Sequence, residues 1–292
     1  MPTSVELAAM RRAIVISASG LGATSPNPAV GCVILDAAGR QAGEGFHLRK
    51  GDAHAEVNAL AAAGGRAAGG TAVVTLEPCN HEGLTPPCHQ ALLDAGITRV
   101  LIAVMDPTSR GAGGAARLRQ AGVDVHTHVL EEEALLVLGP WLAALSYRRP
   151  ALHLLMQADA AGGVSPLSAE ALVEIEVERH AHDLLISPDG SVEEGRSGSH
   201  GRGFSVPAAM PNEPDGALAV VAEAGARSVL LVGPSDLGKR LLNRSLIDRL
   251  TLFMPVPGPS QPATSSPSLP DGFVLSRIAR TSCQLVIRAE RR

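Results

Sequence analysis

Residues 54–88, HAEVNALAAAGGRAAGGTAVVTLEPCNHEGLTPPC, hold the side chains around which the chain is organised. They include one imidazole, His54, two thiols, Cys79 and Cys88, and a carboxylate, Glu56, two residues after the imidazole. Three such protein ligands leave the fourth position of tetrahedral zinc open to water, as in catalytic zinc sites. The pattern therefore predicts a Zn²⁺ site at His54, Cys79 and Cys88, with Glu56 as a catalytic proton shuttle that is not a ligand.

This set of residues suits the hydrolytic deamination of an amino-substituted ring. Zinc lowers the pKa of a bound water to about 7, and a nearby carboxylate can carry protons to the ring nitrogen and to the departing ammonia. Cys88 follows two prolines and precedes a helical run, so we expect the positive helix terminus to lower its pKa. Taken singly, a cysteine or histidine is usually structural. Together, His-x-Glu followed by Glu-Pro-Cys favours a zinc deaminase.

One detail departs from the general deaminase pattern. That pattern ends in Pro-Cys-x-x-Cys, whereas eight residues separate Cys79 from Cys88 here. His81 lies within this gap, so it is an alternative ligand in place of one cysteine.

Strands and helices alternate along the 292 residues, which predicts an α/β fold in two domains, 1–149 and 150–292. A capping box, Thr3 to Glu6, starts the first helix. We expect helices at 4–16, 54–63, 88–95, 114–121, 131–145, 169–181, 216–224 and 237–243. We expect strands at 29–35, at 45–46, and at 72–76, 99–104, 123–126, 151–156, 184–187, 228–232, 250–254, 273–278 and 283–289.

Composition excludes several classes of partner. The net charge is −4 and aromatic residues make up 2%, so the chain lacks the basic field and the stacking platforms that bind nucleic acids. No apolar run approaches the ~20 residues of a membrane span. The N-terminal segment carries the acidic Glu6, whereas a secretory leader has positive charge before its apolar core. We therefore expect a cytoplasmic protein without membrane contact. Four cysteines do not make a disulfide framework in a chain of this length. Cys32 and Cys283 lie in apolar strand patterns and are expected to be buried.

The run from Glu77 to Cys88, the His-Ala-Glu at 54–56, and Ser25-Pro26-Asn27-Pro28-x-Val30-Gly31 resemble the bifunctional riboflavin-biosynthesis deaminase/reductase family. The eight-residue gap is the spacing of that family. The resemblance implies a cytidine-deaminase-like α/β/α sandwich over the first half of the chain. It implies a small aminopyrimidine substrate like 2,5-diamino-6-ribosylamino-4(3H)-pyrimidinone 5′-phosphate. By matching positions, it also implies substrate contacts at Asn27, His47 and Asp106.

Two departures fall among the implied substrate contacts. Leu84 occupies a substrate-binding position where the family usually carries Lys or Arg, and a leucine cannot bind a phosphate. The family's Asp-Pro-Asn-Pro is Asp106-Pro107-Thr108-Ser109 here. We therefore expect an altered substrate, either a related aminopyrimidine of a specialised pathway or one without the phosphate. Arg110, or Arg49 with Lys50, could compensate, and ordinary surface charge is the other interpretation.

The second half resembles the family's smaller, dihydrofolate-reductase-like α/β domain only in outline. The family's Lys-x-x-x-Ser-x-Asp-Gly is LMQADAAG at 155–162, and its glycine-rich cofactor turn is ISPDGSV at 186–192. Glycines in such a turn let backbone amides approach a pyrophosphate. We expect a degenerate domain with no cofactor-binding residues, which binds NADPH weakly or not at all and serves as packing or homo-oligomer surface.

Other interpretations remain open. The chain could be the complete bifunctional enzyme with NADPH, or a non-catalytic, zinc-stabilised partner module for an active reductase. A nucleic-acid-editing deaminase is weaker, given the charge and the scarcity of aromatic residues. His180 and His182 resemble a ligand pair, but without a carboxylate or cysteine nearby in the predicted elements we expect them on the solvated surface.

Overall fold

A computed structural model describes residues 1–81, 86–108, 112–159, 163–201, 204–256, 269–281 and 284–291. The chain forms two compact units. Unit 1 is Met1–Gly139 with His200–Arg202, and unit 2 is Pro140–Ser199 with Gly203–Arg292. The division into domains 1–149 and 150–292 stays a prediction.

Unit 1 is built on a mixed five-stranded sheet in the order β2-β1-β3-β4-β5. Its strands are β1 (Gly31–Leu35), β2 (Gln41–Phe46), β3 (Thr71–Leu76), β4 (Arg99–Val104) and β5 (Asp124–His126). The first two form the expected antiparallel hairpin, and β3, β4 and β5 run parallel. Because parallel neighbours need a crossover connection, a helix separates each pair in the sequence.

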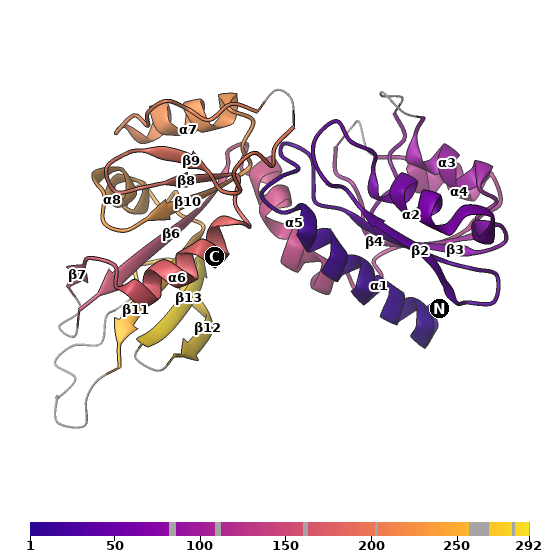
Figure 1. Ribbon diagram of the computed structural model, residues 1–292, viewed down its shortest axis with the longest axis horizontal. Coiled ribbons are helices and arrows are strands. Elements are labelled where there is room, and N and C mark those ends of the chain that lie inside the picture. Colours follow the sequence, from indigo (N-terminus) through magenta and orange to yellow (C-terminus); the bar gives the residue numbers. More distant parts are fainter. Residues whose placement is uncertain are drawn as a thin grey trace. The chain divides into compact units, whose positions relative to one another are not determined.

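The helices of unit 1 cover both faces of this sheet (Figure 1). They are α1 (Ser4–Ser17), α2 (Ala55–Ala63), α3 (Cys88–Asp94), α4 (Gly114–Gln120) and α5 (Glu131–Ser146), which runs on into unit 2. The capping box expected at Thr3 and Glu6 is present. On one face, α2, α3 and α4 bury small aliphatic side chains against the sheet, and α1 packs on the other. The predicted α/β/α sandwich is confirmed.

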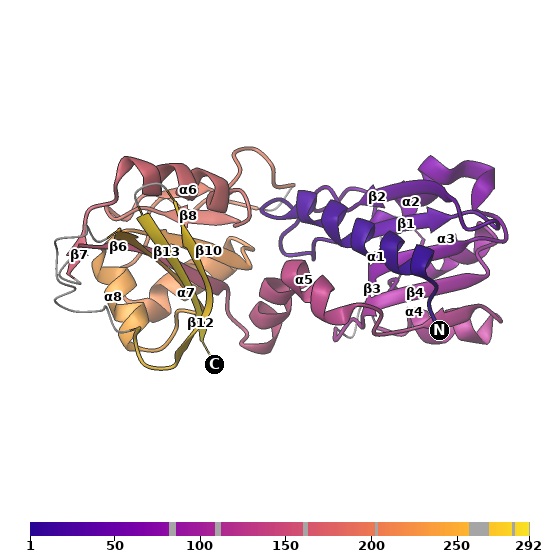
Figure 2. The same cartoon turned by 90° about the horizontal axis from the view of Figure 1, so that it is seen from below.

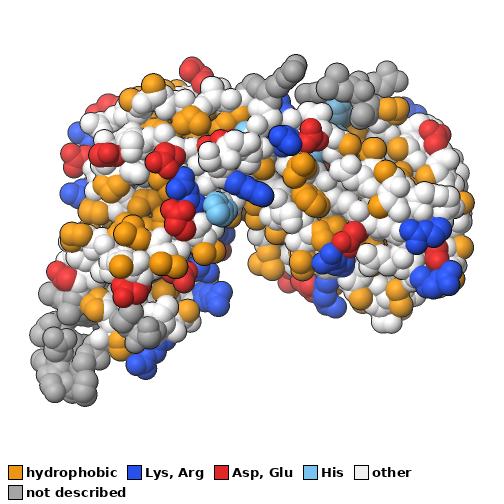
Figure 3. Space-filling view, in the orientation of Figure 1, with side chains coloured by type: hydrophobic (Ala, Val, Ile, Leu, Met, Phe, Trp, Pro, Cys, Tyr) orange, Lys and Arg blue, Asp and Glu red, His pale blue; other side chains and the backbone are white. Residues whose placement is uncertain are grey.

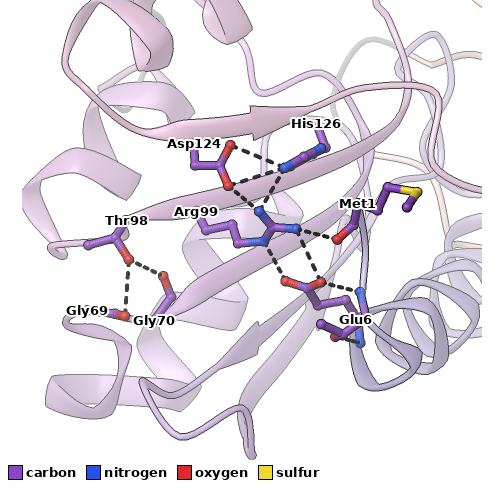
Figure 4. Close-up of polar contacts among 9 residues, drawn as sticks. Met1, Glu6, Gly69, Gly70, Thr98, Arg99, Asp124 and His126 are labelled. Carbon is purple, nitrogen blue, oxygen red and sulfur yellow. Dashed lines mark hydrogen bonds and ion pairs between the residues drawn. The ribbon is translucent and has the colours of Figure 1, made fainter.

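A polar network fixes α1 to the far strands of the sheet (Figure 4). The Nε of Arg99, at the start of β4, donates to the buried carboxylate of Glu6 at 2.6 Å. The same guanidinium pairs with Asp124 and lies 2.7 Å from the Nε2 of His126, both on β5. One arginine therefore joins the first turn of α1 to the edge strand of the sheet.

Unit 2 contains an eight-stranded sheet in the order β12-β13-β11-β6-β10-β8-β9, with β7 paired to β6. Its strands are β6 (Ala151–Ala158), β7 (Val164–Ser165), β8 (Leu184–Ile186), β9 (Val192–Glu194), β10 (Ser228–Val232), β11 (Arg249–Pro255), β12 (Phe273–Arg280) and β13 (Gln284–Arg291). The four central strands, β11, β6, β10 and β8, are parallel. The last two strands, β12 and β13, pair antiparallel as a closing hairpin.

Helices cover both faces of this second sheet as well (Figure 2). Helix α6 (Ala169–Arg179) lies on one face, and α7 (Pro214–Glu223) and α8 (Asp236–Asn243) lie on the other. Alternating residues of β6 serve the two cores, Leu154 facing α7 and α8 and Leu155 facing α6. The sequence missed β7 and β9, because both are very short and β9 lies in a segment rich in Gly, Ser and Pro.

Within the described residues, no helix is both long and apolar enough to cross a membrane. On the face shown in Figure 3, Lys and Arg side chains are interspersed with Asp and Glu. The expected absence of a nucleic-acid partner stays a prediction.

Candidate metal centre and active site

The three predicted ligands lie at the starts of two helices and at the end of a strand. His54 is the N-cap residue of α2, and Cys88 is the first residue of α3, directly after its N-cap, Pro87. Cys79 follows β3 by three residues. Neither N-cap residue caps its helix with a side-chain hydrogen bond. Two helix N-termini therefore meet at the end of a central strand.

The distances between the donor atoms fit a zinc ion. The Nδ1 of His54 lies 3.2 Å from the Sγ of Cys88 and 3.6 Å from the Sγ of Cys79. Tetrahedral zinc, with Zn–N near 2.0 Å and Zn–S near 2.3 Å, places such donors about 3.5 Å apart. All three ligand atoms lie within 4.8 Å of one another. The alternative ligand, His81, is not part of this group.

The pKa values of the two thiols are shifted in opposite directions. A hydrogen bond from the Cys88 thiol, aided by His54 and by the Cys88 backbone amide, lowers the pKa of Cys79 to about 4. Donating to Cys79, together with burial, raises the pKa of Cys88. The lowered pKa that the sequence predicts for Cys88 as a zinc ligand stays a prediction.

The predicted proton shuttle lies against this centre. Glu56 is the second residue of α2 and is 3% exposed. Burial raises its pKa to about 7. A carboxyl group with a pKa near neutrality can both accept and release a proton at physiological pH, which is what a general acid and base needs.

Two predicted substrate contacts lie together beside His54. The side-chain amide of Asn27 lies 3.3 Å from the Nε2 of His47, whose Nδ1 lies 3.2 Å from the carbonyl oxygen of Ala53. A ring N–H donated to that carbonyl leaves Nε2 as the acceptor for the amide. The His47 and His54 rings meet edge to face, with centroids 5.4 Å apart. Burial lowers the pKa of His47, which favours the neutral ring.

The other predicted contacts are placed differently. Asp106 follows β4 by two residues, and its Oδ1 accepts from the backbone amide and the hydroxyl of Thr108 at 2.7 and 2.6 Å. The backbone amide of Asp106 donates to Glu77, two residues before Cys79, and this bond links Asp106 to the loop that carries Cys79. Leu84 and Arg110 lie outside the described residues, as does Cys283. Cys32 is buried in β1, as expected. The substrate-binding roles of Asn27, His47, Asp106 and Leu84 stay predictions.

Sequence reasoning missed the part played by Glu77. This buried carboxylate accepts the amide of Asp106 at 3.3 Å and those of Gly113 and Ala115 at 3.0 Å. Gly114 makes the approach possible, because a Cβ there would lie 1.8 Å from the carbonyl oxygen of Pro78. The signal was available in the sequence, since Glu77 is a charged residue directly after an apolar strand.

Comparison with known proteins bears on this site. Residues 3–104 match the cytidine and deoxycytidylate deaminase zinc-binding region. The diaminohydroxyphosphoribosylamino-pyrimidine deaminase of Buchnera aphidicola (subsp. Acyrthosiphon pisum) is 50% identical over 126 residues, which cover 43% of this chain and 85% of that protein. The riboflavin biosynthesis protein RibD of Escherichia coli is 44% identical over 163 residues, 56% of this chain. The match spans only 44% of the length of the E. coli protein.

Two other comparisons extend over both units. A deaminase/reductase structure from Thermotoga maritima matches 99% of each chain with a TM-score of 0.81 at 22% identity, which shows a shared fold. RibD of Corynebacterium ammoniagenes is 34% identical over 287 aligned residues, 84% of each chain. The resemblance expected from the motifs is therefore confirmed, and the chain belongs to the RibD family of riboflavin biosynthesis proteins.

Proposed function

We propose that this protein hydrolytically deaminates a small aminopyrimidine with the aid of zinc. The observation that carries the proposal is a His-Cys-Cys donor set with a buried carboxyl group, Glu56, against it. The name of the Buchnera relative, a diaminohydroxyphosphoribosylamino-pyrimidine deaminase, supports an aminopyrimidine of the riboflavin pathway as the substrate class.

The chain supplies proton transfer and orientation. Zinc held by His54, Cys79 and Cys88 would make a water molecule acidic enough to ionise near neutral pH. Glu56 takes the proton that water releases as its oxygen bonds to the amino-bearing carbon. Glu56 delivers this proton to the ring nitrogen. It then takes the remaining proton of the added hydroxyl group and delivers it to the leaving nitrogen, so that water is consumed and ammonia and a ring carbonyl are formed.

The test separates catalysis from a zinc-stabilised module. Glu56→Gln should keep its zinc and lose about 10²–10⁴-fold in the rate of ammonia release, which is the usual contribution of a general acid and base. Glu132→Gln, at an exposed position of α5, is the matched control. Full activity in the Glu56 variant would contradict its role as proton shuttle, and a wild-type protein that holds zinc but releases no ammonia would favour the non-catalytic module.

A second assay tests whether the substrate carries a 5′-phosphate. Our proposal is an altered substrate, because a leucine at 84 replaces the family's cation. Purified protein is offered 2,5-diamino-6-ribosylamino-4(3H)-pyrimidinone with and without its 5′-phosphate. Comparable or better turnover of the form without the phosphate supports the altered substrate. Efficient turnover of the phosphorylated form alone contradicts it.

The turn after β8 in unit 2 bears on whether this unit binds NADPH. The turn after β8 leads into an antiparallel partner, β9. In this turn, the Oδ1 of Asp189 accepts the amide of Ser191 at 3.0 Å, and the amide of Gly190 donates to the carbonyl of Ser187. These amides are engaged internally and are not available to a pyrophosphate. We propose that unit 2 binds NADPH weakly or not at all.

Two further features belong to the same proposal. Thiol ligands stay reduced in the cytoplasm, so we place the enzyme there. We also propose a homo-oligomer, with unit 2 contributing surface, and light scattering of the purified protein measures its mass. A monomer at micromolar concentration would contradict the oligomer.

A further inference from the structure

A second cluster of metal-binding side chains lies in unit 2. His153 on β6, Glu178 near the end of α6 and His182 just before β8 offer ligand atoms that all lie within 4.8 Å of one another. Both histidines are buried, 3% and 7% exposed. The expectation that His182 is solvated is therefore wrong, because α6 packs its last turn onto the sheet.

The two rings face each other through one nitrogen each. The Nδ1 of His153 lies 3.3 Å from the Nε2 of His182. The outer nitrogens are also engaged, since the Nδ1 of His182 lies 2.8 Å from the carbonyl oxygen of Glu178 and the Nε2 of His153 lies 2.9 Å from the Oγ1 of Thr251. Histidines that bind metals usually donate their other ring N–H to such oxygens.

The two facing ring nitrogens are spaced as two ligands of one metal ion would be. If both outer nitrogens donate, the two inner nitrogens present lone pairs to each other at 3.3 Å. A metal ion between them would satisfy both lone pairs, whereas a Thr251 hydroxyl that donates to the Nε2 of His153 would leave its Nδ1–H to donate to His182. The separation equals that of two imidazole ligands on tetrahedral zinc, for which Zn–N bonds near 2.0 Å give about 3.3 Å.

The surrounding charges act in both directions. The cluster lies at the C-terminal end of α6, where the helix dipole favours a cation. Arg288 on β13 donates to the Glu178 carboxylate at 2.6 Å. Arg249 on β11 lies opposite His153 in the register of β11 and β6. Burial, followed by the charges of His182 and the two arginines, lowers the pKa of His153. Burial also lowers the pKa of His182. Neutral imidazole is the form that binds a metal.

We propose that His153, His182 and the Glu178 carboxylate form a second metal site. Arg288 pairs with the Glu178 carboxylate, and a bound metal ion would take the place of Arg288. Two imidazoles and one carboxylate suit zinc and related divalent transition metals. A metal ion there would join the end of α6 to β6. The site is independent of the deaminase centre, which has a different donor set in unit 1.

The first test counts metal ions. Chelator-treated protein is titrated with Co²⁺, because cobalt bound by thiolates gives a charge-transfer band that a His, His, carboxylate site lacks. We expect two equivalents per chain, only one of them with that band. His182→Gln should no longer bind the Co²⁺ ion that lacks the charge-transfer band, and its deaminase activity should be unchanged. One equivalent in the wild type, accompanied by the band, would overturn the proposal.

The second test uses variants that keep both histidines. Thr251→Val is nearly isosteric and removes the oxygen beside His153, so it should weaken the second equivalent about 10–100-fold, and Thr251→Ser should restore it. Arg288→Met frees the Glu178 carboxylate and should tighten the same equivalent. A histidine pair joined only by a proton would show neither change, and that result would overturn the proposal even if His182→Gln fails to fold.

Discussion

The carboxylate of Glu77 accepts a hydrogen bond from the backbone amide of Asp106, which lies 3.3 Å from its Oε2. Its other oxygen accepts the amides of Gly113 and Ala115. Because Cys79 follows Glu77 by two residues, one buried side chain fixes the metal loop to the segment that carries Asp106. Glu77 is thus a positioning residue for both.

Replacement of Glu77 should disturb substrate binding more than metal binding. Glu77→Ala leaves three backbone amides without their acceptor, each at a cost of about 1–3 kcal/mol where it is buried. We expect a lower Tm and a raised KM with zinc retained, and a smaller effect for Glu77→Gln, which keeps one carbonyl oxygen. Thermal unfolding, steady-state kinetics and zinc analysis measure these. A wild-type Tm and KM in the alanine variant would contradict the role.

Asn27 should act on the substrate and not on the metal. Its amide contacts His47, whose ring lies against the ligand His54. Asn27→Ala should therefore raise KM with an unchanged zinc content, because no ligand loses a partner. Asn243→Ala, exposed at the end of α8, is the control. Loss of zinc from the Asn27 variant would show that the residue supports the metal centre instead.

Removal of one thiolate ligand should abolish both metal binding and activity. Cys88→Ser lacks a ligand to zinc, so ammonia release should fall to background and Tm should drop, since the starts of α2 and α3 are no longer joined through a metal. Cys32→Ala is the matched control, a buried cysteine on β1 outside the ligand set. If Cys88→Ser kept a full equivalent of zinc, the ligand assignment would fail.

The ion pair of Glu6 and Arg99 should make stability depend on pH. Burial raises the pKa of Glu6, but hydrogen bonds from Arg99 and Thr3 outweigh it, and the pKa is lowered from its ordinary 4.5. Its stabilisation is therefore present above pH 4.5 and is lost as the pH falls through the lowered value. Glu6→Gln should lower Tm at pH 7 and have a progressively smaller effect below pH 4.5. An equal loss at all pH values would show that the charge is irrelevant.

NADPH should not bind to unit 2 with the affinity of an active reductase. The amides of the turn after β8 are engaged by Asp189 and Ser187, and Ser235 accepts the amide of Gly238 at the start of α8. A fluorescence titration should show no saturation at micromolar NADPH. Micromolar affinity would restore the complete bifunctional enzyme as the function.

The sequence alone predicted most of the elements and named the candidate metal ligands. Apolar periodicity and the capping box located the helices and strands within a few residues, because local propensity and the core agree at those positions. His54, Glu56, Cys79 and Cys88 could be named because their chemistry is specific and their spacing is that of a known family. The short β9 could not be predicted, because its pairing with β8 has no sequence pattern of its own.

Only the tertiary structure decided which groups meet. Glu77 reaches Gly113 because a crossover returns the chain to the end of β3, and His153 meets His182 because two strands and α6 bring them together. Hydrogen bonds and burial between distant residues set these properties, whereas local sequence sets only the elements that carry the residues.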